Sequence, residues 1–278
     1  MRAAFAPGLV VVILLAACGG SGSSNSTSGT KNCISAPAGL MSPGTLTIGS
    51  DVSYPPQEFM KQNNPTGFDL DVGAALASKM CLKSTVVNQA FDSIIPALNA
   101  KKFDVIMSAV TITDERKQSV DFVPYFSAGE ALVAKKSSTL HITDLSQLCG
   151  KTVAAEEGTA EKDEVTTSVN PKCPTGKQVN LKTFQTDTEA LQQLRKGTVD
   201  LHFTDSPVAA YEVKQEPGAL RVVSPVLEVA PEGIAVRKDD PQMLSAIQNA
   251  LQRIESDGTY AKLLNKWGVG SGDIRKSS

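Results

Sequence analysis

The sequence predicts an α/β fold in which two doubly wound α/β lobes are joined by two crossing strands. Between residues 46 and 129, short apolar runs alternate with segments of helical hydrophobic period, the pattern of a parallel sheet covered by helices. The same alternation begins again at residue 151. A late strand and two amphipathic helices then finish the chain, so we expect crossings between the lobes near residues 130 and 230.

The expected elements follow from these periods. Strands are expected at 46–50, 85–88, 104–107, 130–134, 151–155, 180–184, 201–204 and 233–237. Helices are expected to start at 67, 91, 113, 159, 186, 205, 243 and 260. Lobe 1 would therefore comprise 33–129 plus 232–270, lobe 2 would comprise 130–231, and 271–278 would form a disordered tail.

The N-terminus predicts export. Residues 1–17 have the features of a secretory signal peptide, with Arg2 before an apolar stretch that is short for a membrane span. The stretch ends in Leu15-Ala16-Ala17-Cys18-Gly19, which resembles the bacterial lipobox, where the cysteine becomes the first mature residue and carries the lipid. Ordinary cleavage beside an incidental cysteine is the alternative. Residues 18–32 would then be a lipidated Cys18 and a flexible tether, anchoring the protein to the outer face of the bacterial cell membrane.

Composition narrows the function and the redox state. The net charge is −2 with both signs interspersed, which gives no indication of a nucleic acid partner.

Besides Cys18 there are four cysteines, and in an oxidising compartment these suggest two disulfides with three possible connectivities. Their order along the chain favours Cys33–Cys81 and Cys149–Cys173. A Cys₄ zinc site is the alternative, but the sequence has no Cys-x-x-Cys pair.

Residues 108–116 are the most informative stretch. A buried strand ends there in small hydroxyl residues, and open α/β sheets bind ligands at the carboxyl ends of their strands. Thr113 is expected to cap a helix, and Arg116 follows one turn later. Hydroxyls, free backbone N–H groups and one guanidinium would together form a receptor for a carboxylate. The alternative is a capped helix with a solvated arginine.

Several segments in order match one family. The segments are Gly49-Ser50-Asp51, Tyr54-Pro55-Pro56, Gly67-Phe68-Asp69-Leu70-Asp71, Phe91-Asp92-Ser93-Ile94-Ile95-Pro96-Ala97-Leu98, Thr111-Ile112-Thr113-Asp114-Glu115-Arg116, Val120-Asp121-Phe122, Asp205-Ser206-Pro207-Val208-Ala209-Ala210-Tyr211, Gly233-Ile234-Ala235-Val236-Arg237 and Asp257-Gly258-Thr259-Tyr260 with Trp267-Gly268. The chain resembles the family 3 solute-binding proteins of ABC transporters for polar amino acids. The resemblance runs from about residue 46 to residue 268 and implies the type II periplasmic binding protein (Venus-flytrap) fold, whose lobes close on the ligand.

The resemblance also implies a ligand-binding set. By position, Arg116 would take the α-carboxylate of an amino acid, helped by Thr111, Thr159 and the backbone at Ser108 and Ala109. Asp205 would take the α-ammonium. Tyr54 and Phe91 would sandwich the ligand side chain, with Asp51 at its far end. Opposed, charge-assisted partners of this kind can replace the water around a zwitterion.

Several of these residues also have a simpler interpretation. Tyr54 and Phe91 could be core aromatics, and Asp205 could cap a helix. Glu156 departs from the family pattern, and with Asp51 it would place two carboxylates at the distal end of the ligand. This favours a basic ligand (arginine, lysine or ornithine), whereas a solvent-facing Glu156 would suit a neutral one such as glutamine.

Two other function classes compete with transport. A dehydratase-like enzyme on the same fold would need acid–base chemistry from Asp51 and Glu156, and the sequence shows no activated nucleophile motif. An amino-acid sensor domain is the other.

The sequence indicates no metal or cofactor. Neither His141 nor His202 has a second residue at the sequence spacing of a metal site, so we expect no metal and no cofactor. The expected partners are a free L-amino acid, an ABC transporter permease and, through the lipid, the membrane; we expect a monomer.

Overall fold

The computed structural model describes Ala4 and residues 33–276, and residues 33 onward form one compact unit. The expected signal peptide (apart from Ala4), the Cys18 lipidation site and the tether lie outside the described residues, as do the last two residues of the expected tail. Among the helices of the described part, none is both long and apolar enough to cross a membrane.

Lobe 1 contains the first parallel strands and both ends of the folded unit. Its strands are β1 (Thr45–Ser50), β2 (Ser53–Tyr54), β3 (Glu58–Lys61), β4 (Asn64–Thr66), β5 (Lys83–Asn88) and β6 (Val105–Ile106). Its helices are α1 (Phe68–Lys79), α2 (Ile94–Asn99), α3 (Arg116–Ser119), α7 (Pro241–Ser256) and α8 (Thr259–Trp267).

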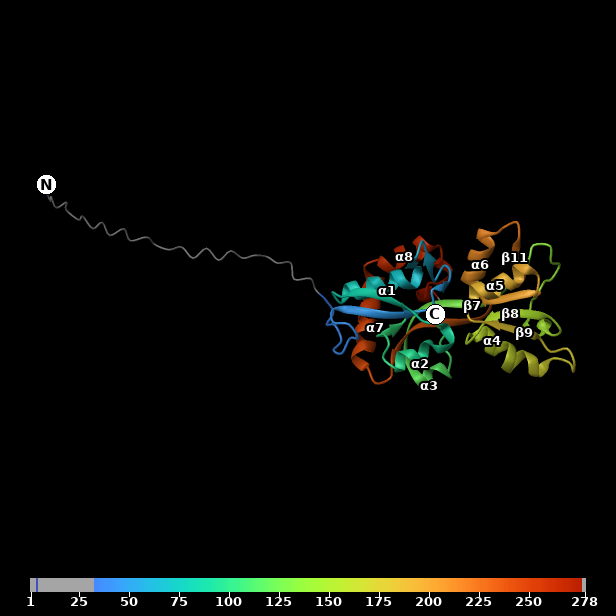
Figure 1. Ribbon diagram of the computed structural model, residues 1–278, viewed down its shortest axis with the longest axis horizontal. Coiled ribbons are helices and arrows are strands. Elements are labelled where there is room, and N and C mark those ends of the chain that lie inside the picture. The colour runs from blue at the N-terminus through green and yellow to red at the C-terminus, as the bar shows by residue number, and fades with distance from the viewer. Residues whose placement is uncertain (1–3, 5–32, 277–278) are drawn as a thin grey trace. The chain divides into compact units, whose positions relative to one another are not determined.

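Lobe 2 repeats the strand–helix alternation. Its strands are β8 (Thr152–Glu156), β9 (Asn180–Phe184), β10 (Leu201–Asp205) and β11 (Leu220–Val222). Its helices are α4 (Ala160–Asp163), which continues as the π-helix Glu164–Val169, then α5 (Asp187–Lys196) and α6 (Ser206–Gln215). Figure 1 shows α4, α5 and α6 at one end of the folded unit and the lobe 1 helices at the other.

Two long strands join the lobes, β7 (Val120–Lys135) and β12 (Leu227–Arg237). They pair antiparallel with each other in the middle of one sheet of order β5-β1-β6-β12-β7-β10-β8-β9, with β11 on β7. The pairing shifts register between Leu227 and Ala230 and between Glu232 and Gly233, so the crossing is irregular where a hinge is needed. The predicted fold class is confirmed. The expected short strand at 130–134 is only the second half of a continuous sixteen-residue strand.

Each lobe has its own apolar core, as the periodicities predicted. The helix α7 is capped by Asp240, whose side chain accepts a hydrogen bond from the backbone N–H of Met243 (3.0 Å), and Pro241 occupies its first turn. It buries residues at helical spacing, namely Met243, Ala246, Ile247, Ala250, Leu251 and Ile254. The two favoured disulfides are both present, Cys33–Cys81 in lobe 1 and Cys149–Cys173 in lobe 2.

The expected disordered tail is wrong for residues 271–276. Gly272 is buried against the Phe126 ring, so closely that a side chain there would overlap it. Asp273 is buried and pairs with Arg275 (2.7 Å), whose guanidinium lies 5.1 Å from the centre of the Tyr260 ring. Close packing of a glycine and one cation–π contact fix this segment against lobe 1. Neither contact produces a periodic pattern in the sequence, so the sequence did not predict this packing.

Candidate functional site

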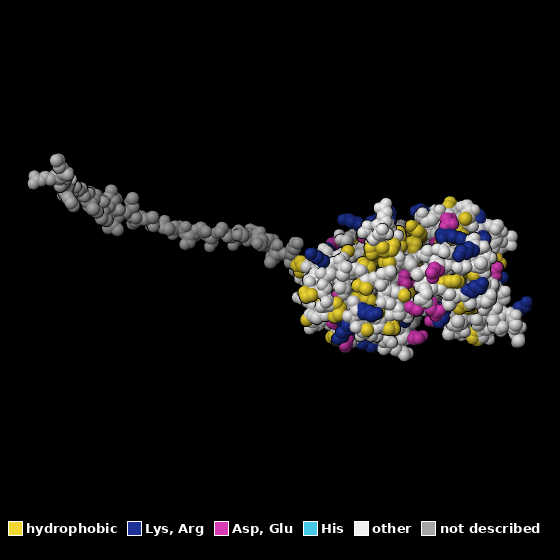
Figure 2. Space-filling view, in the orientation of Figure 1, with side chains coloured by type: hydrophobic (Ala, Val, Ile, Leu, Met, Phe, Trp, Pro, Cys, Tyr) yellow, Lys and Arg dark blue, Asp and Glu magenta, His cyan; other side chains and the backbone are white. Residues whose placement is uncertain are grey.

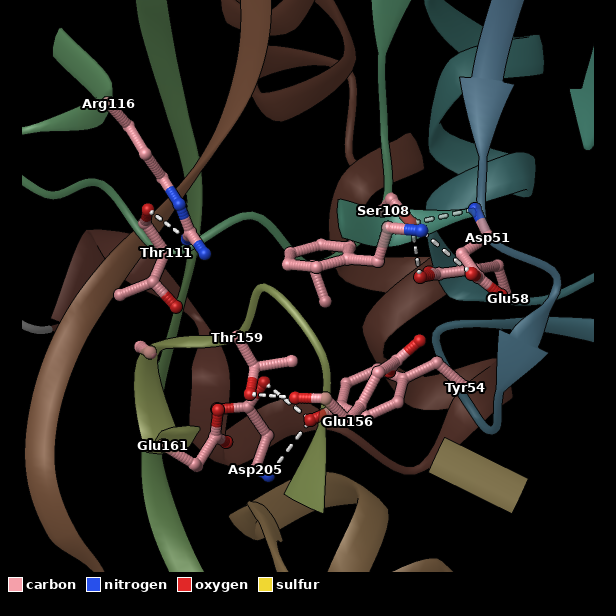
Figure 3. Close-up of a pocket in the computed structure, with 13 residues that line it drawn as sticks. Asp51, Tyr54, Glu58, Ser108, Thr111, Arg116, Glu156, Thr159, Glu161 and Asp205 are labelled. Carbon is pink, nitrogen blue, oxygen red and sulfur yellow. Dashed lines mark hydrogen bonds between the residues drawn. The ribbon is translucent and has the colours of Figure 1, made fainter. Parts of the chain in front are cut away.

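A small cavity lies between the lobes, with walls from both. All ten residues proposed from sequence to bind the ligand line it: Asp51, Tyr54, Phe91, Ser108, Ala109, Thr111, Arg116, Glu156, Thr159 and Asp205. Three more lining residues were not predicted, Glu58, Ala160 and Glu161. Figure 3 shows Arg116 and Thr111 on one side of the cavity and Asp51 with Glu58 on the other.

The lobe 1 wall is fixed by hydrogen bonds at the end of β6. Ser108 Oγ donates to Glu58 Oε1 (3.0 Å) and accepts from the backbone N–H of Asp51 (2.9 Å). Ala109 has a left-handed backbone (φ 46°), and its N–H donates to the buried carboxylate of Asp69 (2.9 Å). The hydroxyl strand end is thus tied to two acids, and it opens into the cavity as the strand pattern predicted.

Arg116 reaches from lobe 1 to lobe 2. Its Nη1 donates to the Thr111 carbonyl (2.8 Å) and its Nη2 to the Gly158 carbonyl of lobe 2 (2.9 Å), while the guanidinium lies 5.3 Å from the centre of the Phe91 ring. A guanidinium has five N–H donors, so these two bonds leave others for a carboxylate. Gly158 has φ 83°, and a Cβ there would lie 2.8 Å from the Asp92 Cα, so the lobes approach this closely only because the residue is a glycine.

Two buried acids, Asp51 and Glu156, occupy the distal end of the cavity. Asp51 accepts bonds from Ser53 Oγ (2.6 Å) and from the backbone N–H of Phe91 (3.0 Å). Glu156 is 4% exposed, and its Oε1 has no hydrogen-bond partner in the described structure. Burial raises the pKa of Glu156 well above its usual range, and the negative charge of Asp51 is the second cause of this rise. Burial also raises the pKa of Asp51. Glu156 therefore does not face solvent.

Tyr54 joins the lobes through its hydroxyl. It donates to Asp205 Oδ2 (2.9 Å) and accepts from the Asp205 backbone N–H (2.9 Å) and from Thr204 Oγ1 (3.0 Å). Asp205 stands at the N-cap position of α6, but its side chain makes no capping bond there. The carboxylate therefore points into the cavity instead of serving the helix, and Tyr54 is an interlobe contact as well as a buried aromatic.

Thr159 caps α4 and supports the neighbouring loop. Its hydroxyl accepts from the backbone N–H of Lys162 (3.4 Å) and donates to the Glu156 carbonyl (2.9 Å). This side chain is therefore occupied by local structure. Any role of Thr159 at the ligand carboxylate would fall to its backbone, as expected for the first residue before a helix.

The comparisons with known proteins agree with this architecture. Residues 46–270 match the family model described as bacterial extracellular solute-binding proteins, family 3. The chain belongs to this family. It is similar to the "ABC transporter arginine-binding protein 1" of Escherichia coli K12, with 33% identity over 228 residues that cover 80% of this chain and 90% of that protein.

Two solved structures show the same likeness in three dimensions. An ancestral arginine-binding protein bound to arginine is 40% identical, covers 81% of this chain and 98% of its own, and superposes with a TM-score of 0.75. An ancestral amino acid-binding protein described as a precursor of cyclohexadienyl dehydratase is 39% identical, covers 81% and 95%, and has a TM-score of 0.73. All three of these relatives are amino acid-binding proteins, and one of them is the precursor of an enzyme.

Acidic side chains outnumber basic ones in the cavity of this solute-binding protein. Five carboxylates line it against one guanidinium, the acids being Asp51, Glu58, Glu156, Glu161 and Asp205. In Figure 2 acidic side chains gather along the middle of the folded unit, between the lobes. Burial raises the pKa of Glu58 and of Asp205 well above the usual range, and that of Glu161 to about 7. Uncompensated buried carboxylates of this kind attract a cation.

His202 gains partners that the sequence did not show. Its Nε2 lies 2.8 Å from Asp187 Oδ1 and its Nδ1 lies 3.3 Å from Glu212 Oε2, all three side chains being buried in lobe 2. Burial lowers the pKa of His202, but the two carboxylates raise it well above its usual range. The three ligand atoms lie within 4.8 Å of one another, as in a metal cluster. Each ring nitrogen already faces a different carboxylate, however, which suits an imidazolium better than one metal ion.

Proposed function

We propose that this chain captures a free L-amino acid with a cationic side chain and delivers it to the permease of an ABC importer. The observation that carries the proposal is the placement of two buried carboxylates, Asp51 and Glu156, across the cavity from Arg116. Arg116 would bind the α-carboxylate and Asp205 the α-ammonium. Arginine, lysine or ornithine would then place its second positive charge between Asp51 and Glu156.

The physical reason is the cost of burying unpaired charge. Glu156 is buried with one oxygen that no described group satisfies, and a carboxylate in that position costs several kcal/mol unless a proton or a cation neutralises it. A guanidinium or ammonium head recovers that cost on binding. A neutral amide such as glutamine offers only a dipole, and it would leave Glu156 protonated.

Lobe closure follows from the same arrangement. The carboxylate receptor belongs to lobe 1, whereas Asp205 and Glu156 belong to lobe 2, so one ligand bridges both lobes. The ligand then binds the closed state more tightly than the open one, and this difference in affinity drives closure. A permease could recognise the loaded protein by its closed shape.

The N-terminal features belong to the same proposal. A signal peptide over residues 1–17, a lipid on Cys18 and a tether to residue 32 would hold a monomeric binding protein at the outer face of the cell membrane. Two acyl chains or more give durable anchoring, since each buried methylene contributes about 0.8 kcal/mol.

Isothermal titration calorimetry with arginine, lysine, ornithine, citrulline and glutamine tests the proposal. Citrulline is the matched control, because it has nearly the shape of arginine without the side-chain charge. Arginine is expected to bind at least tenfold more tightly than citrulline, and Glu156→Gln is expected to abolish most of that difference. Citrulline or glutamine binding more tightly than arginine would refute the cationic ligand. Recovery of the bound amino acid unchanged after incubation, measured by mass spectrometry, distinguishes a binding protein from a dehydratase.

A further inference from the structure

Glu161 lines the cavity, although no sequence motif marked it. It lies in the first turn of α4, directly after Thr159 and Ala160, and its side chain is 4% exposed. Its Oε1 has no hydrogen-bond partner in the described structure. Figure 3 shows Glu161 beside Asp205, on the lobe 2 side of the cavity and away from Asp51.

Glu161 belongs electrostatically to the Arg116 end of the cavity. It is the carboxylate that acts most strongly on Arg116 and on Asp205, whereas Asp51 acts most strongly on Glu156. A structural ion pair would explain a buried acid, but within the described residues no carboxylate lies within 4.0 Å of Arg116. The guanidinium donates to the carbonyl oxygens of Thr111 and Gly158 instead. A buried acid that keeps one carboxylate oxygen without a hydrogen bond, and that faces a cavity, points to a partner on the ligand.

We propose that Glu161 is a ligand-binding residue that shares the α-ammonium of the amino acid with Asp205. The inference rests on the proposed function, because it assumes that Arg116 holds the α-carboxylate beside it. An ammonium has three donors, and one carboxylate cannot accept them all. With Glu161 and Asp205 on one side and Arg116 on the other, both ends of the main-chain zwitterion would be held by charged groups.

The pair of acids has a consequence for protons. Two buried carboxylates that lie close together do not both ionise readily, so the unliganded pair holds a proton that the incoming ammonium displaces. The pKa of Glu161 near 7 agrees with this. The charged or titratable groups that face Glu161 from the neighbouring elements are Arg116 on α3, Asp205 on β10, Asp187 on α5, Glu156 on β8, Glu130 on β7, Glu232 on β12 and Tyr54 on β2. Amino acid binding near pH 7 should therefore release a proton.

The test crosses two variants with three ligands. Glu161→Gln and Glu156→Gln are titrated by calorimetry with arginine, citrulline and des-amino arginine, which lacks the α-ammonium. Glu164→Gln is the matched control, because it has the same chemistry three residues later without lining the cavity. We expect Glu161→Gln to weaken arginine and citrulline by the same factor, on the order of tenfold, and des-amino arginine far less. Glu156→Gln should weaken arginine selectively.

Two further readouts exclude a structural role for Glu161. Removing a buried, unpaired carboxylate should raise the melting temperature of the unliganded protein while weakening binding. Calorimetry in buffers of different ionisation enthalpy should show fewer protons released by Glu161→Gln than by the unmodified chain. Equal weakening of all three ligands, or unchanged arginine affinity, would overturn the role of Glu161. An unmodified protein that binds neither arginine nor citrulline would overturn the proposed function itself.

Discussion

The Tyr54 hydroxyl offers the sharpest test of lobe closure. Tyr54 belongs to lobe 1, and all three of its hydroxyl hydrogen bonds go to Asp205 and Thr204 in lobe 2, at 2.9–3.0 Å. We call these three hydrogen bonds between the lobes the clasp. Tyr54→Phe keeps the buried ring and removes only the clasp. Because burial raises the pKa of Tyr54 well above its usual range, the group stays a neutral phenol at any pH used for binding.

The expected size of the effect follows from the bond types. Each of the two neutral hydrogen bonds contributes a net of about 0.5–1.5 kcal/mol, and the bond to the Asp205 carboxylate about 1.5–3 kcal/mol. Their loss destabilises the closed state by about 3 kcal/mol, near the lower end of the summed range of about 2.5–6 kcal/mol, since in the open state water replaces them. At 1.4 kcal/mol per tenfold change, the dissociation constant should rise roughly a hundredfold. Arginine and citrulline should be affected equally, because the clasp does not contact the ligand side chain.

The single tryptophan provides the assay. Trp267 packs against Phe59 in lobe 1, with ring centres 6.0 Å apart, and Phe59 lies 6.0 Å from Tyr211 in lobe 2. Its fluorescence should therefore change when ligand closes the lobes, and stopped-flow traces should assign the loss in Tyr54→Phe mainly to a faster off-rate. An affinity within threefold of the unmodified protein would refute the clasp. So would a loss confined to one ligand.

Three further predictions concern stability and anchoring. His202→Leu should lower the free energy of unfolding by about 3–5 kcal/mol in chemical denaturation, because it leaves Asp187 and Glu212 as buried acids without their shared partner. Replacing His202, Asp187 and Glu212 together by apolar or amide residues should recover much of that loss. The unliganded protein should melt at a lower temperature at pH 8 than at pH 5.5. Burial raises the pKa of acids such as Glu130, to about 9, so they stay protonated in the folded state, while the unfolded chain loses those protons above pH 4.5. Melting temperatures that rise with pH would contradict this. Cys18→Ser should move the protein from the membrane to the soluble fraction on cell fractionation, and an unchanged distribution would exclude the lipid anchor.

Local patterns predicted the fold well where one face of an element is buried. The helix α7 was predicted from its apolar spacing. The expected cap at Thr113 is only partly right: its hydroxyl accepts from the Arg116 N–H (3.2 Å), but α3 begins at Arg116 and Glu115 stands at its N-cap position. Strand continuity was not predictable in the same way. In β7 both halves bury side chains, but Pro124 and a change of partner strand interrupt the pattern, so only residues 130–134 had a clear strand signal.

The site was predictable where a motif fixes the backbone, and not where tertiary packing decides. Ser108, Arg116 and Asp205 stand at strand ends or helix starts, where the side chains of an α/β fold can reach a ligand. Glu161 lies in a four-residue helix that passes into a π-helix, and there one position of offset decides whether a side chain faces solvent or the cavity. Glu58 depends on the pairing of the small sheet β2-β3-β4, which sequence periodicity does not determine.

The buried acids of this chain fall into two groups, those whose oxygens the chain itself satisfies and those that keep an oxygen without a hydrogen bond. Asp104 is fully buried, and its carboxylate accepts from the backbone N–H groups of Met41 and Thr47 and from the Thr47 hydroxyl, so the chain itself satisfies it. The described carboxylates that keep an unsatisfied buried oxygen all lie around the cavity, its supporting loops or the crossing strands: Glu58, Asp69, Glu130, Glu156, Glu161 and Glu232. Closing the lobes brings these acids together and is costly unless protons or a cation accompany closure. The charge of a basic amino acid would therefore supply part of the free energy of closure, in addition to the contacts that the ligand makes with each lobe.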